Sequence, residues 1–376
     1  MASIVQSVEY VECAWDSGKT GSVNLTKGQD EAKCIPFFTW TLPTVSLADD
    51  FRERCFKVDI YDNAGTAACR VISAGALEAD DRTTGVFVVE FVAAIDVQKV
   101  AWSMAHTVAT TNVAITDVTA QASAFWINTY DFNHSVAVNG FDKATCGSRF
   151  NGASTTSVTI DRTGSTGDIT GWLYVVDCNS GEFTVDHDAI SLAASDQSGT
   201  AAISTVLADS FVLADYNSAE TGNDPNDGAI VVDLNATTTV RARRGITPVT
   251  ANATAVVYTQ TVECQNGEWT VEHGETAIAT ATDTATVTAV TQANSAIISG
   301  CPMSGIMPLG TSDLKATNNL PQLAILLSFN SSTQIALDSQ SRTIETGNIV
   351  PWQIVDFTGS AAAASKLAVL KRIRHF

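Results

Sequence analysis

The stretch Leu173-Tyr174-Val175-Val176-Asp177-Cys178 is an alternating apolar run that ends in a valine, an acid and a cysteine. The same triplet, with Cys or Phe in its last place, occurs five times in the 376 residues. Its copies are Val11-Glu12-Cys13, Val89-Glu90-Phe91, Val176-Asp177-Cys178, Val262-Glu263-Cys264 and Val355-Asp356-Phe357. Their last positions are separated by steps of 78, 87, 86 and 93 residues. Such a period predicts a repeat protein in which each period is one folding unit.

Other landmarks recur in the same order within the periods. An aromatic residue stands four positions before a histidine in the pairs Trp102 and His106, Phe183 and His187, and Trp269 and His273. Apolar runs end at Asn-containing turns in residues 58–65, 136–140, 230–235 and 326–330. Arginines precede the closing triplets as Arg82-Thr83, Arg162-Thr163, Arg243-Arg244 and Arg342-Thr343. Four landmarks in one order support the repeat.

Each period is expected to be a small β-sandwich. In residues 86–91 and 173–178 every second side chain shares a face, so the apolar residues point one way and the acid marks the wetter face. Runs rich in β-branched residues, such as 156–160, are bounded by Gly, Asn, Asp and Ser, which favours strands. A unit of about 85 residues matches a sandwich of seven or eight strands.

The predicted fold class is therefore all-β, with four tandem β-sandwich repeats that are immunoglobulin-like or fibre-module-like and strung along the chain. We expect β-sandwich units at 1–91, 92–178, 179–264 and 265–357. Residues 358–376 are then a basic C-terminal strand or docking tail. The candidate docking residues are Lys366, Lys371, Arg372 and Arg374. A final edge strand with solvated charges is the alternative for this segment.

Charge and composition limit the partners. The chain is 45% hydrophobic and 16% charged, and 21 basic against 40 acidic residues give a net charge of −19. This acidity disfavours nucleic acid as a partner, because phosphates are repelled. The first residues have neither a basic region nor an apolar stretch long enough for a signal peptide, so we expect a cytoplasmic origin without membrane insertion. The acceptor patterns at Asn24, Asn235 and Asn252 are then coincidental.

The cysteines and histidines are read as packing residues. A slot that accepts Cys13, Cys178 and Cys264 but also Phe is apolar, although disulfides among the eight cysteines remain an alternative. The pairs Asp186-His187 and Glu272-His273 place an acid beside a base, but Ala105 replaces the acid in the other copy. Residues 223–228 lack the twelfth-position carboxylate of a calcium loop. We therefore expect no catalytic residue, cofactor or metal.

One segment resembles a known class of protein. Residues 181–192, continuing through 201–213 to the strand Ser210-Phe211-Val212-Leu213, are similar to β-sandwich modules of tailed-phage fibre and virion-decorating proteins. Cys34-Ile35-Pro36-Phe37-Phe38 departs from that pattern. The resemblance implies a virion protein that is assembled in the host cytoplasm and released by lysis.

These observations favour a non-enzymatic structural component of a phage virion: a tail fibre, a collar or head fibre, or a capsid-attached appendage. Its partners are expected to be further copies of itself, with a trimer favoured, and other virion proteins. Weak parallel contacts to a host-surface glycan or receptor would gain avidity from repetition. The candidate surface aromatics for such contacts are Trp15, Trp102 and Trp269, although burial in the core of each unit is the favoured alternative for all three. The alternatives are a bacterial cell-surface adhesin or surface-layer protein, and a polysaccharide-active enzyme.

Overall fold

The computed structural model describes residues 4–15, 20–41, 55–73, 82–133, 141–204, 206, 209–221, 228, 230–244, 253–278, 280–300, 325–338 and 348–358. Their regular structure is almost entirely β-strand, which confirms the all-β class. The strands form where β-branched and aromatic residues alternate with polar ones, as in β11, Ser157–Asp161. Strand pairing groups the chain into four successive modules, numbered here from the N-terminus.

Modules 1 and 2 each contain six strands among their described residues. Module 1 comprises β1 (Val5–Trp15), β2 (Thr20–Asn24), a 3-10 turn (Glu31–Lys33), β3 (Cys34–Thr41), β4 (Lys57–Asp62), β5 (Ala67–Ile72) and β6 (Arg82–Phe91). Module 2 comprises β7 (Asp96–Met104), β8 (Thr110–Ala114), a 3-10 turn (Gln121–Ser123), β9 (Ala124–Asn133), α1 (Phe141–Ala144), β10 (Gly147–Phe150), β11 (Ser157–Asp161) and β12 (Asp168–Asp177).

Modules 3 and 4 repeat the same order of strands. Module 3 comprises β13 (Phe183–Leu192), β14 (Ser198–Ala202), β15 (Phe211–Ser218), β16 (Val231–Ala236), β17 (Thr239–Arg243) and β18 (Ala255–Cys264). Module 4 comprises β19 (Thr270–Ile278), β20 (Thr282–Thr286), a 3-10 turn (Gln292–Asn294), β21 (Ser295–Ile298), β22 (Leu326–Ser331), β23 (Gln334–Asp338) and β24 (Asn348–Asp356).

Every module has two three-stranded antiparallel sheets with one connectivity. In module 1 the orders are β1-β6-β3 and β2-β5-β4, and the other modules follow the same scheme. The first strand pairs with the sixth and the second with the fifth, which is the winding of a six-stranded jelly roll. The expected seven or eight strands per unit is therefore wrong: six strands, three per sheet, make up each described sandwich.

The hairpin turns follow the repeat with one exception to the predicted pattern. Asn63 lies between β4 and β5 of module 1, and Asn235 and Asn330 lie near the ends of the fourth strands of modules 3 and 4, β16 and β22. In module 2 this hairpin contains Asn151, because β10 ends at Phe150 and β11 begins at Ser157. The predicted run 136–140 lies outside the described residues.

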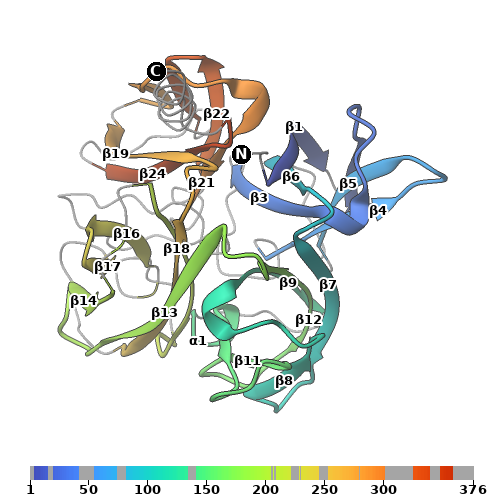
Figure 1. Ribbon diagram of the computed structural model, residues 1–376. Helices are drawn as coiled ribbons and strands as arrows, with labels where there is room; N and C mark the ends of the chain where they lie inside the picture. Colours follow the sequence, from blue (N-terminus) through green and yellow to red (C-terminus); the bar gives the residue numbers. More distant parts are fainter. Residues whose placement is uncertain are drawn as a thin grey trace, which may run out of the picture.

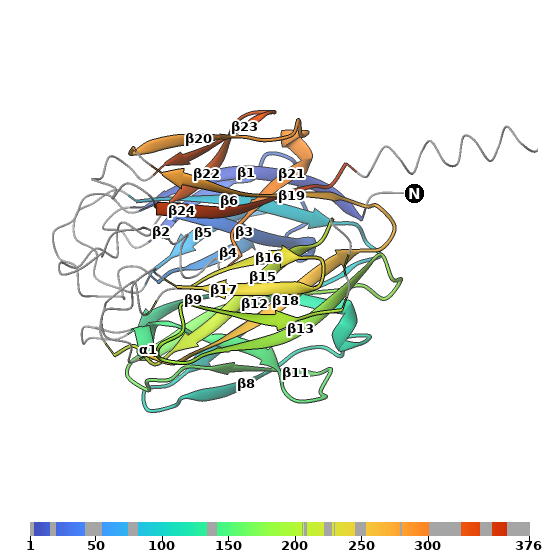
Figure 2. The ribbon, with the colours of Figure 1, turned by 90° about the vertical axis from the view of Figure 1, so that its left-hand side faces the viewer.

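The modules close into a ring and are not strung in a line. Figure 1 looks along the strands and shows modules 1 to 4 following one another around a common centre. In the side view of Figure 2 the strands of all four modules run across the body together. Module 4 also reaches module 1, since Leu327 N donates to Thr39 Oγ1 at 2.9 Å and Lys27 Nζ donates to Ala293 O at 3.0 Å.

A shared apolar core explains the ring. One cluster of buried residues draws members from all four modules. At its centre the Phe211 ring lies 6.2 Å from Phe37, 6.0 Å from Phe125 and 5.8 Å from Trp269, which belong to modules 1, 2 and 4. All eight residues of β3 are buried, so this strand is covered on both faces. A solitary sandwich would leave one face of each sheet in water.

Candidate functional site: the seams between modules

Each interface between neighbouring modules, called a seam here, is built around one repeated position on the first strand. The residues at this seam position pair directly with a residue of the sixth strand of the same module. The four pairs are Tyr10 with Phe87, Lys99 with Tyr174, His187 with Gln260, and His273 with Gln353. The repeat thus places four different side-chain chemistries at one geometric site.

At two seams a glutamine closes the edge strand of the preceding module. Gln260 Oε1 accepts a hydrogen bond of 2.8 Å from Trp126 N, and Gln260 Nε2 donates one of 3.0 Å to Trp126 O. Gln353 holds the peptide groups of Val212 in the same way, at 2.8 and 2.9 Å. Trp126 and Val212 lie on β9 and β15, which are edges of their sheets. The side-chain amide therefore replaces the missing next strand.

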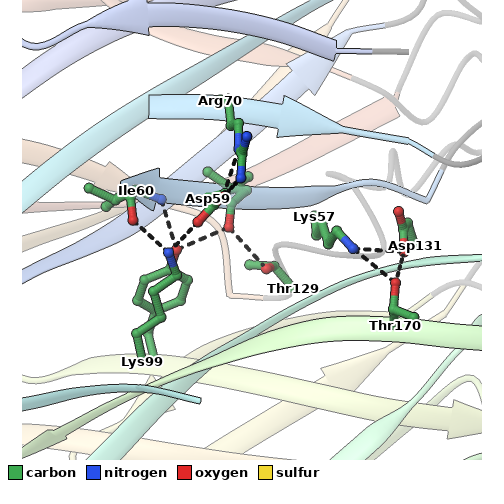
Figure 3. A network of polar contacts seen from close by, with 10 residues as sticks. Lys57, Asp59, Ile60, Arg70, Lys99, Thr129, Asp131 and Thr170 are labelled. Carbon is green, nitrogen blue, oxygen red and sulfur yellow. Dashed lines mark hydrogen bonds and ion pairs between the residues drawn. The ribbon is translucent and has the colours of Figure 1, made fainter. Parts of the chain in front are cut away.

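The seam between modules 1 and 2 is held by charges (Figure 3). Asp59 is buried and receives Lys99 Nζ of the next module together with Arg70, whose Nη2 lies 2.6 Å from Asp59 Oδ2. Lys99 Nζ also donates to Ile60 O at 2.6 Å and lies 4.4 Å from the centre of the Trp172 ring. Lys57 Nζ adds a second bridge, at 2.9 Å from Thr170 Oγ1.

The seam between modules 4 and 1 is apolar. The Tyr10 ring packs on Phe87 with centroids 4.8 Å apart, and Phe87 meets Phe329 of module 4 edge-on at 5.7 Å. Burial raises the pKa of the Tyr10 phenol far above its ordinary range, and Glu12 adds to this rise. The phenol stays protonated and donates to Glu12 Oε1 at 2.8 Å.

The two histidines at the seam position are structural donors. His187 Nε2 lies 3.0 Å from Ala124 O, and His273 Nε2 lies 2.8 Å from the equivalent Ser210 O of module 3. The His187 ring also stacks on Trp126 with centroids 5.2 Å apart. Burial lowers the pKa of both imidazoles, which favours the neutral ring with its proton on Nε2.

The acids beside these histidines do not act with them. Asp186 Oδ2 accepts a hydrogen bond of 2.7 Å from Ser204 N, and Glu272 Oε2 accepts one of 2.7 Å from Thr288 N. Alternation along the strand turns each acid to the face opposite its neighbouring histidine. The two His-acid pairs therefore fix strand and loop and form no acid-base dyad.

A groove lies beside each of the two seam histidines, His187 and His273. The groove between modules 2 and 3 has a volume of about 260 Å³ and is lined by His187, Arg149, Tyr258 and Asp188, among others. The groove between modules 3 and 4 has a volume of about 210 Å³ and is lined by His273, Asp233, Arg241 and Glu275, among others. They occupy the same place in the repeat, and sequence reasoning missed both because they need two modules.

A carboxylate without an ionic partner is buried near the first groove. Asp215 of β15 is 8% exposed, and no described residue forms an ion pair with it. It accepts a hydrogen bond from Ser148 Oγ of module 2, which itself accepts one of 2.6 Å from Trp126 Nε1. Burial raises the pKa of Asp215 to about 7, and the Ser148 hydrogen bond only partly opposes this.

The acid of the repeated triplet is buried in three of its five copies. Glu90, Asp177 and Asp356 are 3%, 6% and 9% exposed. Each accepts a backbone hydrogen bond from the loop before the third strand, donated by Asp30 N, Thr119 N and Thr291 N respectively. The predicted wetter face is therefore wrong here, because alternation gives the side of the sheet but not the loop that covers it. Glu263 is half-buried.

The first triplet belongs to a different strand from the others. Cys13 lies on β1 opposite Thr84, whereas Cys178 directly follows β12 and Cys264 is the last residue of β18. The predicted equivalence of Cys13 to these two cysteines is therefore wrong: its triplet lies in the first strand of a module, and theirs lie at the end of the sixth strand. Cys178 and Cys264 instead begin matching turns, in which Glu182 N and Glu268 N donate to the sulfur at 3.2 and 3.1 Å. Gly181 and Gly267 supply the positive φ, +80° and +77°.

Seven cysteines are buried free thiols in the described part of the chain, which agrees with an apolar role: Cys13, Cys34, Cys55, Cys69, Cys146, Cys178 and Cys264. Cys301 lies outside the described residues. Their sulfur atoms meet backbone or carboxylate groups, as in the 3.1 Å contact from Cys34 Sγ to Asp30 O.

Two of the candidate surface aromatics are buried, which is the alternative that the sequence favoured for them. Trp102 and Trp269 are 6% and 2% exposed, so both lie in the interior. Trp15 ends β1, and its side chain lies outside the described residues. Trp102 is also not equivalent to Trp269, because it lies late in β7, where it pairs with Gly171. The residue of module 2 that is equivalent to Trp269 is Ile95: each directly precedes the first strand of its module, β19 or β7. Trp102 is likewise not equivalent to Phe183, the first residue of β13.

Among the described residues, the repeated arginines are equivalent in modules 2 and 3. Arg162 and Arg244 follow β11 and β17 and are 3% and 1% exposed. Arg162 donates to Val108 O, Gly167 O and Ala105 O, and Arg244 donates to Ala253 O and Ala193 O. Both tie loops together at one end of a module. Arg82 instead opens β6, and Arg342 lies outside the described residues.

The candidate docking residues Lys366, Lys371, Arg372 and Arg374 lie outside the described residues, as do 223–227 of the calcium-loop candidate. Within the described ranges, no three metal-binding side chains are grouped as a metal site would need. The described chain also contains no helix of the length and apolarity needed to span a membrane.

Comparison with protein-family models and with curated proteins gives no match to this chain. The seams are thus interpreted from their geometry alone. They join rigid sandwiches through amide clamps, ion pairs and aromatic contacts, and two of them leave a polar groove.

Proposed function

We propose that this chain is a non-enzymatic structural component of a tailed-phage virion, as a fibre, collar or capsid-attached appendage. The observation that carries the proposal is that the repeated residues serve to pack the modules together. Buried aromatic residues from all four modules meet at one centre, and the repeated histidines and glutamines hold neighbouring backbones. Such a body suits mechanical spacing and display. The resemblance of residues 181–213 to virion modules supplies the assignment to a phage.

The shape favours some virion positions over others. A closed ring of four sandwiches suits a compact knob or appendage better than a slender shaft (Figure 1). Val108 is the one large apolar side chain exposed among the described residues, and the net charge is −19. Both features suit a body that faces solvent. Self-association and contact with other virion proteins belong to the same proposal.

Quantitative mass spectrometry of purified virions tests this function. The protein should be present in stoichiometric copies, a fixed multiple of a known virion component. Its absence from particles that contain the other structural proteins would refute the assignment.

The basic tail provides a second test. Deletion of residues 366–376 should abolish incorporation while the four modules keep the thermal stability of the full chain. Normal incorporation of the truncated protein would remove the tail as the docking element but leave the virion assignment intact.

A further inference from the structure

The four seams differ in how completely the seam position fills them. Lys99 spans its seam to Asp59 and Ile60 O, and Tyr10 covers its seam by packing on Phe87. His187 is shorter, and its Nε2 is directed to the backbone of residues 121 and 124. His273 is held likewise by Ser210 O. The hollows of about 260 and 210 Å³ lie at these two histidines.

The walls of both grooves are polar, and their arginines are already paired with acids. In the first groove Arg149 forms an ion pair with Asp161 and donates to Tyr258 Oη at 3.1 Å. In the second, Arg241 and Arg243 share Asp233, and Arg243 also pairs with Glu275. An anionic ligand would have to break one of these pairs, and it would also meet the Asp188 carboxylate in the first groove. A polyhydroxyl ligand can add hydrogen bonds to the remaining donors and acceptors.

The histidines add an acceptor to each groove. Because Nε2 donates to a carbonyl, Nδ1 of the neutral ring is the nitrogen that can accept a hydrogen bond from a ligand hydroxyl. The Tyr258 ring, whose centre lies 5.0 Å from the Arg149 guanidinium carbon, gives the first groove an aromatic side. Both volumes are below those of pockets for drug-sized ligands, which begin at about 300 Å³.

We propose that the two seam grooves each bind one neutral sugar ring of a glycan. The two sites are quasi-equivalent and lie on one rigid body, so a polymer with repeated sugars would gain avidity from both. The expectation that the glycan belongs to a host surface rests on the proposed function. The binding itself rests on the grooves.

The lip of the first groove offers a matched pair of variants. Ala189 is exposed, lines the groove and pairs with Tyr258. Ala101 is exposed at the equivalent position of the seam that Lys99 fills, where it pairs with Trp172. Ala189→Trp should obstruct the first groove, and Ala101→Trp should leave it open. Glu275→Trp should obstruct the second groove. His187→Lys places a lysine at the seam position, as Lys99 does in module 2, and is a second way to close the first groove.

Saturation-transfer NMR with glucose, galactose and N-acetylglucosamine, each against the full-length protein, tests the proposal. N-acetylneuraminic acid serves as the charged comparison. At least one neutral sugar should receive saturation from the wild type and from Ala101→Trp. The dissociation constant should rise about tenfold or more when both grooves are closed by Ala189→Trp with Glu275→Trp, or by His187→Lys with Glu275→Trp.

Three results would overturn the inference: no transfer to any neutral sugar, equal transfer to the doubly closed variants, or transfer to the acidic sugar only. Thermal melts identify variants that fail to fold. Absence of the protein from virions with intact sugar binding would reject the proposed function alone. Presence in virions without sugar binding would reject this inference alone.

Discussion

Gln260 and Gln353 close two sheet edges with one side chain each. A primary amide has one acceptor and a donor group, so it matches the paired N–H and C=O of an edge residue. Both amides are buried, at 3% and 4% exposure. Since an unmet buried peptide group is costly, these clamps set the contact between modules 2 and 3 and between modules 3 and 4.

Gln260→Met keeps the length of the side chain but removes both hydrogen bonds to Trp126. We expect a loss of about 2–4 kcal/mol in the free energy of unfolding, because two buried peptide groups lose their partners. Urea denaturation measures this. Gln265→Met is the control, because Gln265 is exposed and bonds only to Thr184 Oγ1 among the contacts of its side chain. Equal losses in the two variants would contradict the clamp.

Asp215 makes stability depend on pH. Its pKa is about 7 in the folded chain and lies near 4 when the chain unfolds, so between these values the folded state holds more protons. The contribution of Asp215 to stability is therefore most favourable below pH 4 and is lost as the pH rises through about 7. Asp215→Asn should raise stability at pH 8 by roughly 2–4 kcal/mol and by little at pH 4.

Denaturant titrations of the wild type and Asp215→Asn at pH values from 4 to 8 check this difference. Asp117→Asn, at an exposed position, controls for the general loss of negative charge. A gain that does not grow with pH, or an equal gain in Asp117→Asn, would remove the buried carboxylate as its cause.

At the scale of elements, the first strand of each module decides how its seam is built. In module 2 that strand is β7, whose Lys99 neutralises Asp59 across the seam (Figure 3). Lys99→Met should cost about 1–3 kcal/mol, a value reduced because the Lys99 side chain is 26% exposed. Lys143→Met is the matched control: its side chain is 25% exposed, and its ion pair with Asp142 is 3.8 Å long. Thermal unfolding should separate the two variants.

The strands and the repeat could be predicted from sequence, because alternation and β-branched runs act locally. Residues 173–178 and 86–91 do form the predicted strand ends. The burial of Asp177 could not be predicted, since it depends on a loop 58 residues away in sequence. The grooves could not be predicted from the sequence either, because each is lined by side chains from two modules.

A signal for the ring was nevertheless present in the chain. The run Cys34-Ile35-Pro36-Phe37-Phe38 is apolar on both faces, which indicates a strand covered on two sides. In the sequence alone this run stands out only as a departure from the pattern of virion modules. The candidate docking tail and Trp15 stay predictions, because the described residues do not include their side chains.

For the whole molecule, Phe211 joins all four modules through Phe37, Phe125 and Trp269. Phe211→Ala should cost about 3–5 kcal/mol and raise amide hydrogen exchange in every module. Phe132→Ala is the control, because Phe132 is fully buried in a cluster centred on module 2. Its exchange should rise mainly in module 2. Protection lost only in module 3 of Phe211→Ala would argue against a shared core.

The radius of gyration of the monomer in solution tests the closed ring most directly. Small-angle X-ray scattering coupled to size-exclusion chromatography provides it. A compact body of 376 residues should give about 21 Å. Four sandwiches strung in a line would give roughly 35 Å, given modules of about 12 Å each. The closed ring predicts the smaller value, and a monomer near the larger one would show that the modules are strung out.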